Sequence, residues 1–256
     1  MEIMIDIHTH ILPGIDDGAQ DEQEAILMAR AAVQEGIKAV IATPHHANGR
    51  YDNPGHEIQK RTQALNLALS EHRIALEVLP GQEVRIHQGL LEDLEQGKII
   101  TLSGSKYLLL ELPSGMVPSY TEEMIHELIV LGITPIIAHP ERNAELASSP
   151  SVLMRLLERG ALTQLTSHAV DGRFGRKLQK LCLEWCRQGM VHMISSDAHN
   201  INDRPFGLKN AYAAISAHLN DTLAEELKDN TERLISRLEI RTLQPVLLNR
   251  KWWKLW

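Results

Sequence analysis

The chain of 256 residues carries a formal net charge of −7, with 43% apolar and 23% charged residues, which are ordinary values for a soluble globular protein. The acidic balance argues against a nucleic-acid-binding surface, because phosphate backbones attract basic proteins. No apolar run approaches the roughly 20 residues of a membrane span, and the first residues lack the basic start of a signal peptide. Two cysteines make no disulfide framework, so we expect a cytoplasmic protein.

Strands and helices are predicted to alternate along the chain. Apolar segments predict buried strands at Ile3–His8, Leu76–Gly81 and Tyr107–Glu111. Four more strands each follow a glycine that suits the left-handed end of a helix, namely Gly36, Gly132, Gly160 and Gly189. The expected helices are Glu22–Glu35, Glu57–Glu71, Glu122–Leu131, Val152–Arg159, Arg176–Gln188, Leu208–Leu219 and Asp221–Leu227. Asp21 and Glu24 resemble a capping box for the first helix.

This alternation predicts an α/β fold with a parallel sheet, and about seven strands without a change of pattern suggest a closed barrel. An open, doubly wound sheet is the alternative. We expect one domain over residues 1–248 and a basic, tryptophan-rich tail, NRKWWKLW, over residues 249–256. The tail either contacts a membrane surface or a partner protein, or packs on its own barrel or on a sister subunit.

Residues of metal-binding type gather at the predicted strand ends, which converge at one face of a parallel barrel. His8 and His10 lie two apart on an extended segment, so both imidazoles face the same side. Glu111 follows a run of three leucines, and a buried carboxylate there requires a compensating charge, which a metal ion provides. The remaining candidates are His45, Glu83, His139, Asp197 and His199, together with Asp16 and Asp17 in the first loop.

Three ions with bridging carboxylates would use such a set, since nine ligands, counting one aspartate of the first loop with the eight others, are too many for one ion. Mixed imidazole and carboxylate ligands suit zinc, manganese or iron. Independent hydrogen-bonded polar residues at loop entrances explain any one of these positions but not the series. A thiol mechanism is excluded, because Gln188 and His192 stand where cysteine phosphatases need an arginine, six residues after Cys182 and Cys186.

Five motifs carry a resemblance to a known family, in the right order: DIHTHILPGIDDG (Asp6–Gly18), PGQE, LLLELP, GITPIIAHPER and SSDAHN. They resemble the polymerase and histidinol phosphatase (PHP) family and, more narrowly, the bacterial protein-tyrosine phosphatases of capsule and exopolysaccharide gene clusters. The resemblance extends from about residue 1 to about residue 235. It implies a distorted seven-stranded (β/α) barrel with three divalent metal ions, commonly manganese, with iron or zinc as alternatives.

The resemblance also implies a role for each site residue. The first ion would take His8, His10, Glu83 and Asp197. The second would share Glu83 and take Glu111 and His139, and the third would take Asp17, His45 and His199. Arg142 in HPER and Arg204 in NDRP match arginines that hold the phosphate, and they are the predicted catalytic residues.

The implied activity is hydrolysis of phosphotyrosine on a protein, with a bacterial tyrosine kinase as the expected partner. A metal-bridging hydroxide would attack the phosphorus, because metal binding lowers the pKa of water toward neutrality. Histidinol phosphate or another small molecule is the alternative substrate. A non-catalytic regulator is a third hypothesis, against which the complete ligand set argues. The sequence leaves open the oligomeric state and the roles of His46 and His168.

Overall fold

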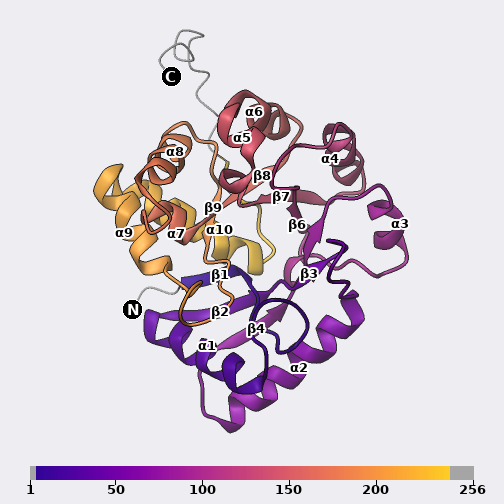
Figure 1. The fold of residues 1–256 in the computed structure, drawn as a ribbon, viewed down its shortest axis with the longest axis vertical. Helices are drawn as coiled ribbons and strands as arrows, with labels where there is room; N and C mark the ends of the chain where they lie inside the picture. The colour runs from indigo at the N-terminus through magenta and orange to yellow at the C-terminus, as the bar shows by residue number, and fades with distance from the viewer. Residues whose placement is uncertain (1–3, 243–256) are drawn as a thin grey trace.

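The computed structural model describes residues 4–242, so the predicted tail 249–256 lies outside the described residues. Strands and helices alternate as predicted, and the helices surround the strands (Figure 1). The strands form two sheets, with the orders β1-β2-β4 and β3-β5-β6-β7-β8-β9. All of the ladders within these sheets are parallel. Between residues 4 and 242 no helix is long and apolar enough to cross a membrane.

The elements agree closely with the predicted ones. The strands are β1 (Met4–Thr9), β2 (Ile37–Ala42), β3 (His45–His46), β4 (Glu77–Pro80), β5 (Glu83–Arg85), β6 (Tyr107–Glu111), β7 (Thr134–Ala138), β8 (Leu162–Thr166) and β9 (Met193–Ser195). The α-helices are α1 (Glu22–Glu35), α2 (Gly55–Glu71), α3 (Leu90–Glu95), α4 (Thr121–Val130), α5 (Ala144–Ser148), α6 (Pro150–Glu158), α7 (Ser167–Val170), α8 (Arg176–Arg187), α9 (Leu208–His218) and α10 (Asp221–Ile235). Two 3₁₀ turns are η1 (Leu102–Gly104) and η2 (Pro140–Arg142).

The predicted count of seven strands is not confirmed, because the described residues contain nine strands. Two of the nine are short strands that follow predicted ones: β3 comes after β2 and the break at Thr43–Pro44, and β5 comes after the predicted strand Leu76–Gly81 and Gln82. Proline has no N–H for the ladder. Gly81 packs so closely that an added Cβ would lie 2.6 Å from the Ile41 side chain. The hydrogen bonds therefore define two sheets, and no single closed barrel is present in residues 4–242.

The two sheets meet where β1 ends. The His8 carbonyl accepts the Asp197 N–H at 2.9 Å, and the His10 N–H donates to the Ala198 carbonyl at 2.8 Å. An isolated parallel bridge joins Thr9 to Ala198 at the same point. The segment that follows the last strand is thereby held against the end of the first, and both segments carry predicted ligands.

The predicted helix ends are also confirmed. Gly36, Gly132, Gly160 and Gly189 have φ angles of 98°, 77°, 99° and 70°, in the left-handed region that favours glycine. Helix α1 begins after Asp21, whose carboxylate accepts the Glu24 N–H at 2.9 Å. Helix α10 continues beyond the predicted end at Leu227 to Ile235, because its buried face continues through Leu234.

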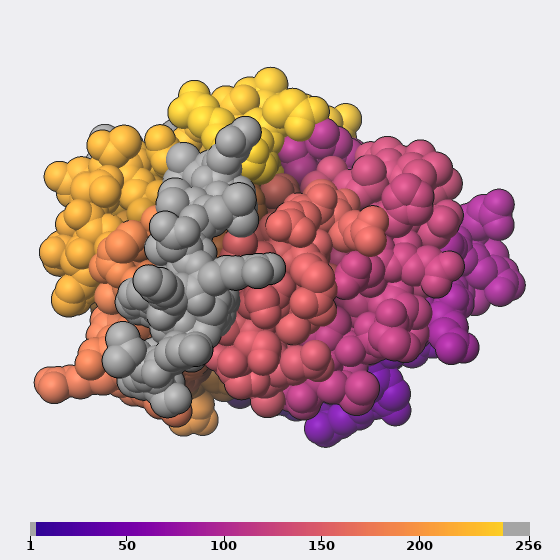
Figure 2. All heavy atoms as spheres, turned by 90° about the horizontal axis from the view of Figure 1, so that it is seen from above, coloured from indigo at the N-terminus to yellow at the C-terminus, as the bar shows by residue number. Residues whose placement is uncertain are grey.

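Apolar side chains fill both faces of the strands, as expected in a parallel sheet. The larger cluster packs helices against strands, and the smaller one takes alternate residues such as Ile5 and Ile7 of β1 together with Leu234 of α10. The segment after α10 lies beside the middle of the chain (Figure 2), where the Ile240 N–H donates to the Tyr107 hydroxyl at 3.0 Å. Tyr107 is the first residue of β6, so this segment covers amino ends of strands and leaves the carboxyl ends for a site.

Candidate metal centre

The predicted ligand side chains lie together at the carboxyl ends of the strands. The Nε2 atoms of His8 and His10 are 3.3 Å apart, as expected for two imidazoles on the same side of a strand. Glu83, the first residue of β5, lies among four imidazoles. Its Oε1 is 2.7 Å from Nε2 of His139 and 3.6 Å from Nε2 of His8. Its Oε2 is 2.7 Å from Nδ1 of His45 and 3.4 Å from Nε2 of His10.

All nine predicted ligands belong to groups whose ligand atoms lie within 4.8 Å of one another. The groups are His8–His10–Asp197, His8–Glu83–His139, His45–Glu83–Glu111 and His10–Asp17–His45–His199. This grouping differs from the one that the resemblance implies. Glu83 is absent from the group of Asp197, Glu111 accompanies His45 whereas His139 accompanies His8, and His10 also belongs to the group of Asp17. His45 lies beside Glu83 because the two residues are register partners in the β3–β5 ladder.

Several ligand atoms are buried without a hydrogen-bond partner in residues 4–242, namely His45 Nδ1, Glu83 Oε2, Asp197 Oδ1 and His199 Nε2. A buried polar atom left in this way costs about 1–3 kcal/mol. Each of the four points at other ligand atoms. Asp197 Oδ1, for example, is 3.3 Å from Nε2 of both His8 and His10. Divalent cations bound between them would satisfy these atoms, so the residues fit a metal centre with nitrogen and oxygen ligands.

Other side chains orient the imidazoles. Asp16 Oδ2 lies 2.6 Å from Nδ1 of His10, and Gln164 Oε1 lies 3.0 Å from Nδ1 of His8. These contacts leave both Nε2 atoms facing the cluster, which is how metal-binding histidines are usually supported. The two aspartates of the first loop therefore have different roles: Asp16 orients His10, and Asp17 belongs to a ligand group. Gln164 was missed by the sequence analysis, because a lone glutamine inside strand β8 matches no ligand pattern.

Charges within the cluster shift the pKa values in opposite directions. Burial raises the pKa of Glu83, but the imidazoles of His8 and His45 outweigh it and hold that pKa well below its usual range. Burial lowers the pKa of His45, yet the carboxylates of Glu83 and Asp17 raise it to about 9. Burial and the nearby His10 lower the pKa of His199 to about 4. His45 is therefore protonated at neutral pH, and a metal ion bound there would have to displace that proton.

Two arginines converge on one carboxylate oxygen. Arg142 Nη1 and Arg204 Nη2 both donate to Asp197 Oδ2, whereas Asp197 Oδ1 faces His8 and His10. The side chains of Arg142 and Arg204 are 38% and 29% exposed, so solvent and ligands can reach them. One oxygen of Asp197 therefore contacts the two arginines, and the other faces the predicted ligands His8 and His10.

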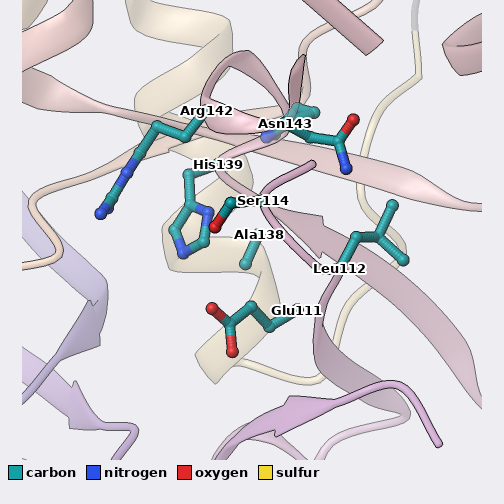
Figure 3. Close-up of a pocket in the computed structure, with 8 residues that line it drawn as sticks. Glu111, Leu112, Ser114, Ala138, His139, Arg142 and Asn143 are labelled. Atoms are coloured by element: carbon teal, nitrogen blue, oxygen red, sulfur yellow. The ribbon is translucent and has the colours of Figure 1, made fainter. Parts of the chain in front are cut away.

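A cavity of about 40 Å³ opens beside this arrangement. Figure 3 shows the imidazole of His139 and the carboxylate of Glu111 directed into a common space, with Arg142 and Ser114 nearby. The backbone of His139 is left-handed, with a φ of 33°, as is that of Asp197 at 55°. Such angles are rare outside glycine and are found at functional sites, where the surrounding structure holds them.

Three other side chains around the cluster differ in their roles. Arg85 was missed by the sequence analysis, and its Nε donates to Glu111 Oε2 at 2.9 Å because Arg85 and Glu111 are register partners. His46 is buried with Nδ1 3.0 Å from Asp52, outside the four ligand groups. His168 also lies outside them, and its Nε2 is 2.9 Å from the Pro205 carbonyl.

Known proteins resemble this chain over almost its full length. The family model for capsular polysaccharide synthesis, CpsB/CapC, matches residues 4–236. Tyrosine-protein phosphatase YwqE of Bacillus subtilis is 41% identical over 97% of this chain and 98% of its own length. Tyrosine-protein phosphatase CpsB of Streptococcus pneumoniae is 31% identical over 91% of this chain and 98% of its own length.

Solved structures agree. A crystal structure from the work on Bacillus subtilis YwqE and Streptococcus pneumoniae CpsB, described as unique metal-dependent tyrosine phosphatases, superposes with a TM-score of 0.92 and 42% identity. It covers 95% of this chain and 99% of the solved one. An organophosphorus hydrolase from Deinococcus radiodurans has a TM-score of 0.55 at 12% identity and shows a similar fold only.

Proposed function

The chain belongs to the CpsB/CapC family of capsular polysaccharide synthesis, and from this membership we propose that it is a metal-dependent protein-tyrosine phosphatase. The observation that carries the proposal is the cluster of nine ligands beside two arginines that converge on Asp197. The names of the relatives supply the substrate class, phosphotyrosine on a protein. The proposed physiological substrate is a bacterial tyrosine kinase in the cytoplasm.

Three divalent ions, preferably manganese, would be held by the cluster, and Glu83 would contribute to more than one site because it belongs to two of the ligand groups and its two oxygens face different imidazoles. Bound ions supply Lewis-acid stabilisation of the phosphoryl oxygens and lower the pKa of water so that it becomes a nucleophile near neutral pH. Asp16 and Gln164 hold His10 and His8 with their Nε2 atoms directed inward. The protein's part is therefore to fix the geometry of the ligands before the substrate arrives.

Arg142 and Arg204 are proposed to bind the phosphoryl group. Their guanidinium groups meet at a single carboxylate oxygen, Asp197 Oδ2, next to the ligand atoms. A phosphate carries several such oxygens, and arginine binds them bidentately with a permanent charge. Donors held in place before the reaction neutralise charge as it develops in the transition state. In this role both arginines would hold the phosphoryl group beside the ligand cluster.

We further propose one domain over residues 1–248 with the architecture of an interrupted barrel. Treating β2 with β3, and β4 with β5, as two interrupted strands gives seven strand positions. The junction of Thr9 with Ala198, which links the first position to the last, supports this arrangement.

The proposal is tested with purified full-length protein, loaded with manganese and assayed on a phosphotyrosine peptide, the matching phosphoserine peptide and histidinol phosphate. We expect the phosphotyrosine peptide to have the highest kcat/KM and chelation to abolish turnover. If histidinol phosphate were hydrolysed with a higher kcat/KM than the phosphotyrosine peptide, the substrate would be a small molecule and not a protein. Absence of hydrolysis of all three by metal-loaded protein would contradict the phosphatase assignment.

A further inference from the structure

The loop between β3 and α2 carries a tyrosine next to the metal cluster. The side chain of Asn48 accepts the N–H of Tyr51 at 2.8 Å, and the side chain of Asn53 donates to the His45 carbonyl at 2.8 Å. Asn53 also donates to the Ile15 carbonyl at 3.0 Å, which ties this loop to the first loop of the chain. Tyr51 is thus held in position by two asparagines on either side of it.

The ring of Tyr51 is oriented as well as placed. It lies nearly parallel to the imidazole of His45, at an interplanar angle of 7° and a centroid distance of 6.0 Å. The guanidinium carbon of Arg50 lies 4.9 Å from the centroid of the same ring. Tyr51 is only half-buried, whereas Arg50 is exposed. One aromatic ring therefore stands partly open at the His45 side of the cluster.

This ring contact with a predicted ligand sets Tyr51 apart from the other described phenylalanine, tyrosine and tryptophan side chains. Phe174, for comparison, is 43% exposed and packs against His168, outside the ligand groups. Arg142 and Arg204 contact Asp197, so the guanidinium groups and the Tyr51 ring border different members of the cluster. These two members are connected through His10, whose Nε2 is 3.3 Å from Asp197 Oδ1 and whose ring centroid is 4.6 Å from that of His45.

We propose that Tyr51, backed by Arg50, is a specificity-determining residue that receives the aromatic ring of the leaving group, so that aryl phosphomonoesters are preferred over alkyl ones. The inference rests on the proposed phosphatase function and names the residue that selects its substrate class. Paired aromatic rings gain from an offset or edge-to-face arrangement as well as from buried area. A serine or glycerol phosphate offers no ring for this contact.

The test compares the binding of phenylphosphonate and methylphosphonate to the manganese-loaded full chain by calorimetry. Wild type should bind phenylphosphonate more tightly, and Tyr51→Leu should lose roughly three- to tenfold of that preference. Tyr51→Phe should retain it, because the hydroxyl is not part of the contact. Phe174→Ala is the matched control, an exposed aromatic away from the ligands, and it should bind both phosphonates as wild type does.

The same variants are then assayed on a phosphotyrosine peptide and on glycerol phosphate. Tyr51→Leu should raise KM for the peptide with little change in kcat, and it should hydrolyse glycerol phosphate at the wild-type rate. An equal loss on both substrates or both phosphonates, or no loss, would overturn the role of Tyr51. A wild-type enzyme that hydrolyses neither substrate contradicts the phosphatase function instead, and the phosphonate preference still decides the role of Tyr51.

Discussion

Strand β9 is flanked by two buried histidines, which are alike in burial but differ in their hydrogen bonding and in their neighbours. His192 precedes the strand, is 5% exposed, and its Nδ1 accepts the Thr163 N–H at 3.1 Å. His199 follows the strand, is 2% exposed, and its Nε2 has no hydrogen-bond partner in residues 4–242. Burial alone lowers the pKa of His192 to about 4, so this imidazole is neutral and serves as a hydrogen-bond acceptor.

The surroundings explain the difference. The His192 backbone exchanges hydrogen bonds with Thr163 and Asn230, all of them neutral groups. His199 Nε2 lies 3.4 Å from Asp17 Oδ1, within a group that also contains His10 and His45. Burial of histidine by itself therefore indicates nothing about metal binding. The distinguishing feature is the convergence of unpaired nitrogen and carboxylate atoms from several strands on one place.

The largest expected effect follows from removing the carboxylate of Glu83, which belongs to two ligand groups at the carboxyl ends of the strands. Glu83→Ala should lower kcat/KM on a phosphotyrosine peptide on the order of a thousandfold, because two ions lose a ligand. His45→Ala should cost less, since His45 lies at the partly exposed edge of the cluster. Both variants should keep a cooperative thermal transition, because the apolar strands form the core. Near-normal turnover of Glu83→Ala at saturating manganese would show that Glu83 is not a metal ligand required for catalysis.

A second effect separates phosphate binding from metal binding. Arg142→Ala should lose roughly a hundredfold in kcat/KM, as expected when a charge-assisted donor to the transferring group is removed, and should retain its metals. Arg142→Lys should recover only part, because a point charge does not reproduce the bidentate fork. Arg155→Ala is the control, an exposed arginine paired with Glu122. Loss of metal from Arg142→Ala, measured by elemental analysis, would make Arg142 a structural support.

The third prediction concerns the orienting carboxylate. Asp16→Ala should weaken manganese binding about tenfold or more, because His10 loses the partner that directs its Nε2 inward. Activity should fall at limiting manganese and recover at high concentration. Calorimetric titration with manganese checks this. Unchanged affinity in Asp16→Ala would show that the His10 imidazole is held without Asp16.

The last change, at the amino end of β9, should leave activity unaltered and act on stability. The pKa of His192 lies below its ordinary value, so its contribution to the free energy of unfolding is present above pH 6.5 and is lost as the pH falls toward 4. Between pH 7 and 5 this loss is about 2 kcal/mol. In urea unfolding, His192→Gln should reduce this loss of stability between pH 7 and 5, whereas His126→Gln, at an exposed position, should leave it unchanged. Equal acid sensitivity in all three proteins would contradict the neutral state of His192.

Sequence patterns predicted the element order well because most strands are largely apolar and four helices end at glycine. They did not predict the short strands β3 and β5, because these strands depend on pairing with each other and with β6 and not on an apolar run of their own. The ligand residue types at the strand ends were predicted, and the structure brings those nine side chains together. Their binding of metal remains a prediction.

The supporting residues were harder to predict. Arg85 contacts Glu111 through the register of β5 and β6, and Gln164 reaches His8 across 156 positions of sequence. Neither contact leaves a local pattern, because both depend on which strands become neighbours. Tyr51 likewise gains its place from asparagine contacts in its loop and from the stacking on His45.

The central claim is that the carboxyl-end cluster is a metal centre, and a manganese titration of metal-free protein followed by elemental analysis tests it most directly. Wild type should bind about three ions per chain and release protons, because His45 has a pKa of about 9 in the metal-free state. His192→Gln should bind the same number. A chain that binds no divalent ion, and whose phosphatase activity survives chelation, would contradict the account.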